Sequence, residues 1–177
     1  MDTHSESPYR HARRAFIAAC EHAHLDTVAR LNPARSPDGK PLFMDCAAMG
    51  PRLAGRAVLV VARGQTGSEM LVALLDGGIE LPPDARLVLV HALDPADFAG
   101  VAGDPGWPTA MLQAEVTEDL RKVRELGVLV LEAGPDLTPV LAARLPNARI
   151  TALPAAAGAE AARAAIAAFF SPAAGAQ

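Results

Sequence analysis

The sequence predicts an α/β fold: one domain with a mainly parallel sheet of four to five strands flanked by helices. Three apolar runs, at residues 57–62, 86–92 and 127–132, support this prediction. Strands that are apolar along their whole length are typical of a parallel sheet covered on both faces. Segments with helical spacing of apolar residues alternate with these runs, which favours helical crossovers between parallel strands.

The first half of the chain contributes several elements. Apolar residues that recur on one helical face predict a helix over residues 8–30. A cluster of turn-forming residues predicts a loop over residues 32–40, followed by a short strand over residues 42–47. The first long apolar strand breaks into a Gly-rich turn, and a helix is expected over residues 68–75, closed by a pair of glycines.

The second half continues the alternation beyond the strand at residues 86–92. The expected elements are a loop over 94–108, a helix over 109–126, a strand over 127–132, a helix over 137–145, a strand over 148–153 and a helix over 159–170. Residues 8–170 are therefore expected to form the single α/β domain. Residues 1–7 and 171–177 are expected to be flexible ends.

Composition excludes several classes of protein. The 177 residues suit one domain, and 51% hydrophobic residues exclude intrinsic disorder. The net charge is −4 with scattered arginines, so no basic stripe indicates a nucleic-acid partner. No apolar run approaches the ~20 residues of a membrane span, and we expect a soluble, cytoplasmic protein. Cys20 and Cys46 lie in apolar contexts and are expected to be buried thiols.

Any site is expected at the carboxyl ends of the parallel strands, where ligands of open α/β sheets bind. The segments that follow the strands are 63–69, 91–97, 132–136 and 154–158. The residues proposed to line a pocket there are Arg63, Gly64, Thr66, Gly67, Ser68, Glu69, His91 and Asp94.

The segment R-G-Q-T-G-S-E at residues 63–69 matches neither a Walker A loop nor G-x-G-x-x-G. A Gly-rich turn that opens a helix can still present backbone N–H groups to an anion. Residues 65–68 resemble the FMN-phosphate loop of flavodoxin-like proteins, which raises the hypothesis of a phosphate or cofactor binder. The alternative is a tight turn that caps the next helix. Flavin sites also need aromatic walls, and the chain has only one Trp and one Tyr.

Residues 8–100 resemble an uncharacterised bacterial family of the zinc-carboxypeptidase and aspartoacylase-like superfamily. The opening helix of that family is matched by HARRAFIAAC, and its turn with a short strand by SPDGKPLFMDCAAMGP. Its strand and metal loop are matched by VLVVARGQTGSEM, and its strand ending in His-Ala-Leu-Asn-Pro by LVLVHALDPADFAG. The resemblance implies a shortened carboxypeptidase-like core.

The sequence departs from this family at positions that bind zinc and substrate in the family. The zinc ligands of the family's His-x-x-Glu motif correspond to Thr66 and Glu69, so the carboxylate is kept and the imidazole is lost. The family's Asn in Asn-Pro is Asp94, and its Arg- and Asn-rich segment for substrate carboxylates is absent. The family's second ligand His, expected after a later strand, has its nearest counterpart in Glu132. Catalytic zinc takes three protein ligands, usually including His, and Thr is a poor substitute.

Three functions remain open. The leading hypothesis is a catalytically degenerate relative that acts by binding, as a subunit or small-molecule binder, with no metal or cofactor. The second is a metal-dependent hydrolase, a peptidase or amidohydrolase, with zinc at Glu69, His91 and Glu132, although a lone His at a strand end is more often structural. The third is the flavodoxin-like binder. A homo-oligomer or a complex with another protein subunit is expected, with Phe169 and Phe170 of the last helix as a docking surface.

Overall fold

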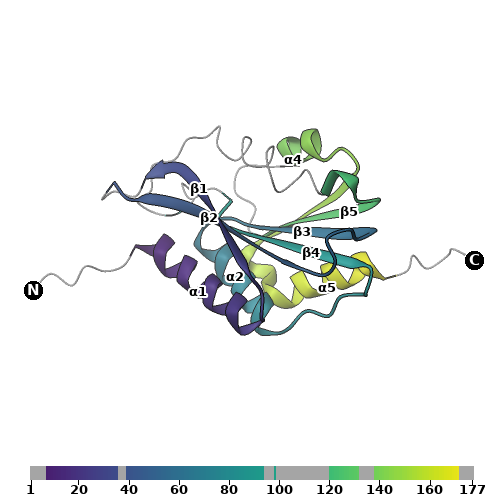
Figure 1. Cartoon of the computed structure of the whole chain (residues 1–177), viewed down its shortest axis with the longest axis horizontal. Helices are drawn as coiled ribbons and strands as arrows, with labels where there is room; N and C mark the ends of the chain where they lie inside the picture. Colours follow the sequence, from purple (N-terminus) through teal and green to yellow (C-terminus); the bar gives the residue numbers. More distant parts are fainter. Residues whose placement is uncertain (1–6, 36–38, 94–97, 99–119, 132–137, 172–177) are drawn as a thin grey trace, which may run out of the picture.

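The computed structural model describes residues 7–35, 39–93, 98, 120–131 and 138–171 of the chain. They form a six-stranded sheet with helices packed against it (Figure 1). The strands are β1 Thr27–Arg35, β2 Pro41–Met49, β3 Arg56–Ala62, β4 Ala85–His91, β5 Glu125–Leu131 and β6 Ala148–Leu153. The helices are α1 Pro8–His22, α2 Gly64–Asp76, α4 Thr138–Arg144 and α5 Gly158–Phe170, with 3-10 turns η2 Leu120–Lys122 and η3 Ala155–Ala157.

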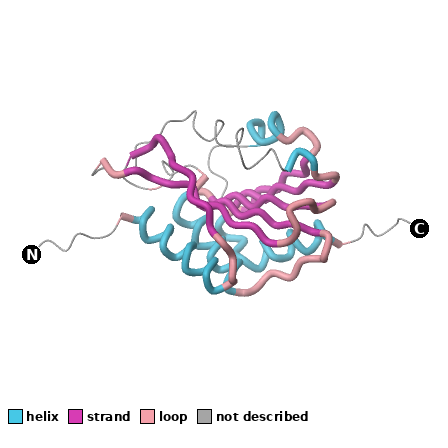
Figure 2. Tube along the Cα trace, viewed as in Figure 1, coloured by secondary structure: helices cyan, strands magenta, loops and turns pink. Residues whose placement is uncertain are grey.

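The sheet has the strand order β1-β2-β4-β3-β5-β6. Strands β4, β3, β5 and β6 are parallel, and the antiparallel hairpin β1–β2 joins them through antiparallel pairing of β2 with β4. Figure 2 shows the strands as one layer with helices packed against it. Residues 57–62 of β3, in the middle of the sheet, are all buried. The prediction of an α/β fold with a mainly parallel sheet is confirmed.

Helices lie on both faces of this sheet. Helices α1, α2 and α5 cover one face, and α4 lies on the other (Figure 1). Alternate residues of β3 serve the two faces: Val58 and Val60 pack in the cluster that includes α2 and α5, whereas Leu59 and Val61 pack in the cluster that includes Leu141 of α4. A strand that is buried on both sides must be apolar at every position, which explains its continuous apolar run.

The first predicted helix was too long. Helix α1 ends at His22, and residues 27–35 form β1, an edge strand that raises the strand number to six. Val28 lies opposite Cys46 in the antiparallel pairing with β2. Over a stretch as short as residues 23–30, the spacing of apolar residues fits either a helix or a strand. The residues from Thr27 onward form a strand because they pair with β2. The loop predicted from residue 32 therefore begins inside a strand.

The helix predicted over residues 109–126 also extends too far. Residues 109–119 lie outside the described part, Leu120–Lys122 is a 3-10 turn, and Glu125 already belongs to β5. Glu125 is paired with Arg56 in the parallel ladder with β3. The loop predicted over residues 94–108 lies outside the described residues except for Phe98, which is buried.

The other predicted elements agree with the structure. The strands expected near residues 42–47, 57–62, 86–92, 127–132 and 148–153 are β2 to β6, and the helices expected near 137–145 and 159–170 are α4 and α5. Their boundaries differ from the prediction by two residues at most. None of the helices in the described part of the chain has the length and apolar character needed to cross a membrane.

Candidate functional site

Two backbone hydrogen bonds tie together the carboxyl ends of three parallel strands. The Leu93 N–H donates to the carbonyl of Ala62 at 3.2 Å, which links the end of β4 to the end of β3. The Arg63 N–H donates to the carbonyl of Leu131 at 3.2 Å, which links β3 to β5. This is the sheet edge at which the sequence places its candidate residues.

Helix α2 begins at Gly64, four residues before the predicted start. Gly64 has a φ of +60°, and the Gly67 N–H donates to the carbonyl of Arg63 at 3.2 Å, closing the first helical turn. The Gly-rich turn predicted here is therefore part of the helix. Glycine adopts the positive φ of Gly64 without strain. Gly67, in the helix interior, costs about 1 kcal/mol relative to alanine, but it is buried and tertiary packing overrides that preference. The four residues compared with a flavodoxin-like loop lie in this helix.

Thr66 and Glu69 lie on the exposed side of α2. The Gln65 side-chain amide donates to Oε1 of Glu69 at 3.0 Å. Glu69 also lines a cavity of about 180 Å³ between α1 and α2, together with His11 and Ala15. Glu69 is thus one of the residues at the seam between the two helices.

Arg63 and Ser68 are buried, unlike Thr66 and Glu69. Arg63 is the N-cap residue of α2 and makes no side-chain capping bond to the helix. The Ser68 hydroxyl is shielded from solvent and has no hydrogen-bond partner among the residues that the structure describes. Two other predicted residues, Asp94 and Glu132, lie outside the described residues.

His91, the last residue of β4, is fully buried. Its ring stacks on Phe16 of α1, with 5.0 Å between ring centroids and 14° between planes, and Phe98 lies at 6.3 Å. Neither ring nitrogen has a hydrogen-bond partner within the described part of the chain. Burial, with the nearby positive charge of Arg13 as a smaller cause, lowers the pKa of His91 to about 3. The imidazole is therefore neutral at physiological pH.

An ion pair between a buried carboxylate and a partly buried guanidinium lies beside His91, and the residues named from the sequence did not include it. Asp45 of β2 lies directly opposite His91 of β4 in the antiparallel register and is 1% exposed. The Arg13 guanidinium of α1 binds its carboxylate with two hydrogen bonds, Nε to Oδ2 at 2.8 Å and Nη2 to Oδ1 at 3.0 Å. The bond to Asp45 raises the pKa of Arg13 above its ordinary value. A bidentate pair of this kind fixes the position of α1 on the sheet.

Tyr9 makes a second polar connection between α1 and β2. Its hydroxyl donates a hydrogen bond to the carbonyl of Phe43 and accepts one from the N–H of Phe43, both at 2.6 Å. Burial raises the pKa of Tyr9 to about 12. One signal in the sequence could have indicated this region: Asp45 is the lone charge within the otherwise apolar stretch PLFMDCAAM.

The donors for a metal are dispersed in the described part of the chain. No three His, Cys, Asp or Glu residues among the described residues are grouped closely enough to hold a metal ion. Glu69 lies at the α1–α2 seam, whereas His91 lies between aromatic rings. The two residues named together by the sequence analysis thus have different surroundings.

These features define an α/β protein with a mixed sheet, whose first helix is held to the sheet by a partly buried Arg–Asp pair and a stacked histidine. Residues 5–101 match the DUF2817 family, described as a protein of unknown function. The chain belongs to this family. A search of curated proteins finds no significant match.

Several solved structures align with part of this chain at low identity. A glutaminyl cyclase from Porphyromonas gingivalis aligns with a TM-score of 0.43 and 12% identity, over 71% of this chain and 59% of that one. A Zn-dependent exopeptidase from Parabacteroides distasonis gives 0.43 and 10%, over 74% and 62%. A carboxylesterase from Bacillus subtilis gives 0.42 and 13%, over 83% and 49%. The chain thus spans about half to three fifths of their lengths, and its assignment rests on the family match alone.

Proposed function

We propose that the protein is a catalytically degenerate relative of the zinc carboxypeptidases that acts by binding, as a protein subunit or a small-molecule binder. One observation carries this proposal. Thr66 and Glu69 stand in the places of the two ligands of a His-x-x-Glu zinc motif. Both lie on the exposed side of α2, and the Glu69 carboxylate accepts a hydrogen bond from the Gln65 side chain. The protein keeps the fold elements around the motif while one of the motif's two zinc-binding side chains is absent.

The described residues do not fit a catalytic zinc. Zinc in such sites takes three protein ligands, and a threonine hydroxyl is a weak donor in the place of an imidazole. His91 is neutral, as a ligand must be, but its ring is enclosed by Phe16 and Phe98 and is 0% exposed. A site at Glu69, His91 and Glu132 would need the His91 ring to leave this enclosure. That altered-site hydrolase is the competing function.

The first prediction concerns zinc. Protein purified without chelators is expected to contain far less than one zinc per chain by mass spectrometry. The variant Thr66→His is expected to bind zinc more tightly than wild type in a calorimetric titration. Its imidazole would stand three residues from Glu69, on the same exposed face of α2, where both can reach one ion.

The matched control is the double variant Thr66→His, Glu69→Gln, which keeps the new imidazole and removes the carboxylate. It is expected to lose the gained zinc affinity. About one zinc in the wild-type protein would instead favour the altered-site hydrolase. Equal zinc binding by the single and double variants would show that the metal binds elsewhere on the chain.

The binding partner that we propose is a second copy of the chain, paired through strand β6. This strand is at one edge of the sheet, and three of its six residues are exposed, including Thr151. The opposite edge strand β1 carries a register shift between Asn32 and Arg35, an irregularity that hinders edge pairing. Strand β6 pairs with β5 in unbroken register.

The docking surface expected on the last helix needs correction. Phe170 is only 5% exposed, and its ring stacks edge-on against Phe169 with 5.2 Å between centroids. The Arg56 guanidinium covers the Phe170 ring and donates to the Phe170 carbonyl at 2.8 Å. These two aromatic residues therefore anchor α5 to the sheet, and the edge of β6 is the surface that we propose for association.

Light scattering tests this association. The wild-type protein is expected to have twice the 18.4 kDa mass of the chain. The variant Thr151→Lys, which places a charge on the edge strand, is expected to shift it toward the monomer. Thr66→Lys, which adds the same charge to an exposed threonine of α2, is the control and is expected to stay dimeric. A monomeric wild type at high concentration would contradict the proposal.

A further inference from the structure

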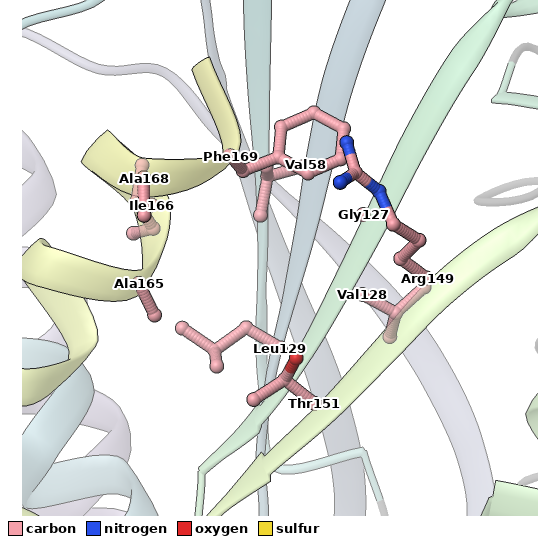
Figure 3. A pocket seen from close by; sticks show the side chains of 10 residues that line it. All are labelled: Val58, Gly127, Val128, Leu129, Arg149, Thr151, Ala165, Ile166, Ala168 and Phe169. Carbon is pink, nitrogen blue, oxygen red and sulfur yellow. The ribbon is translucent and has the colours of Figure 1, made fainter. Parts of the chain in front are cut away.

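A hollow of about 200 Å³ lies between α5 and the strands β5 and β6 (Figure 3). It is lined by Val58, Gly127 and Arg149, which are near the amino ends of their strands, and by residues of α5 that include Ala165 and Phe169. The hollow is therefore near the opposite strand ends from His91 and Ala62. It forms a second candidate site, separate from the one at the carboxyl ends of the strands.

Arg149 is held in place at this hollow. Its guanidinium lies over the ring of Phe169, 4.8 Å from the ring centroid (Figure 3). The Phe169 ring in turn lies directly on the backbone of Gly127, because a Cβ at that position would be 2.8 Å from Cδ2 of the ring. A guanidinium stacked on an aromatic ring keeps the N–H groups at its edge available for a planar anion.

The chemistry of the lining favours one kind of ligand. Arg149 is the one charged residue among the described residues that line the hollow, and Thr151 supplies a hydroxyl. The other lining side chains are apolar, among them Leu129, Ile166 and Phe169. No carboxylate of the described residues forms an ion pair with Arg149. A phosphate would need several N–H donors, whereas one planar guanidinium beside an apolar wall matches a single carboxylate on an apolar body.

We propose that this hollow binds a small carboxylate with an apolar body, such as a medium-chain fatty acid. The Arg149 guanidinium binds the carboxylate, and the wall formed by Leu129, Ala165 and Ile166 contacts the apolar chain. The proposal does not depend on the loss of the zinc motif, because the hollow shares no residue with Thr66, Glu69 or His91.

Titration of isotope-labelled protein with octanoate, followed by amide chemical shifts, tests the proposal. Octanoate is expected to shift the amides of Gly127, Thr151 and Ala165. Octanamide, which has the same chain without the charge, is expected to bind more weakly, and octylamine more weakly still. The variant Arg149→Gln is expected to weaken octanoate binding about fivefold, the upper range for an ion pair in contact with solvent.

Two further variants test whether binding depends on the charge at this position and on the space in the hollow. Arg124→Gln removes the same charge from an arginine whose side chain is 78% exposed and that does not line the hollow, and it is expected to leave octanoate affinity unchanged. Ala165→Leu fills the hollow and is expected to reduce the affinity while Arg149 stays in place. Equal binding of octanoate and octanamide, unchanged affinity in Arg149→Gln, or no shifts at these amides would each overturn the proposal.

Discussion

Replacing Arg13 with methionine is expected to lower the free energy of unfolding by about 3 kcal/mol, the lower end of what is found when one partner of a buried ion pair is removed. The reason is Asp45, which is 1% exposed and binds Arg13 through both carboxylate oxygens. Without Arg13 the carboxylate must either stay charged without a partner or take up a proton. Urea unfolding at pH 7, followed by circular dichroism, measures the change.

The double variant Arg13→Met, Asp45→Leu is the informative control. It removes both charges, so it is expected to recover most of the stability that the single variant loses, because an apolar pair can replace a buried ion pair at little cost. Arg124→Gln, at an exposed position, is expected to stay within about 0.5 kcal/mol of wild type. A similarly small effect of Arg13→Met would show that the pair does not hold α1 on the sheet.

Acid is expected to destabilise the protein through His91. In the unfolded chain the imidazole has its ordinary pKa of 6.5 and takes up a proton as the pH falls. In the folded protein burial keeps the pKa near 3, so the ring stays neutral. The unfolded state therefore binds more protons between these two values, and stability falls across that window. The loss between pH 7 and pH 4 is expected to be about 3 kcal/mol from this group.

His91→Phe separates this contribution from those of the carboxyl groups. The variant keeps an aromatic ring for Phe16 and Phe98 to contact and removes the two ring nitrogens, which have no hydrogen-bond partners among the described residues. Urea unfolding of both proteins at pH 7 and pH 4 is the measurement. The variant is expected to lose less stability on acidification, by about the same 3 kcal/mol. Parallel losses in the two proteins would contradict the enclosed, neutral state of His91.

The sheet was the part of the fold that could be predicted from local pattern. Continuous apolar runs at β3, β4 and β5 indicate burial on two faces, and this information lies in consecutive residues of one strand. Strand β1 could not be recognised in this way, since its apolar spacing also fits a helix. Its pairing with β2 joins residues up to 20 positions apart, as with Thr27 and Ala47.

For the candidate site too, the sequence predicted the positions along the chain but not the surroundings of the side chains. The sequence predicted that residues 63–69 follow a strand and that His91 lies at a strand end, and the structure adds that these two strands, β3 and β4, are parallel neighbours. It could not tell that Glu69 lies at the α1–α2 seam while His91 is enclosed by rings, since the direction of a side chain depends on which helix packs above it.

The sequence by itself therefore determined the α/β class and most of the strands. Only the tertiary structure decided the pairing of Arg13 with Asp45, the depressed pKa of His91 and the stacking of Arg149 on Phe169. The physical reason is that apolar burial is repeated along an element and is visible in its pattern. A polar contact instead joins single residues from elements that are distant in the chain, 32 positions apart for Arg13 and Asp45, and nothing in the local sequence specifies its partner.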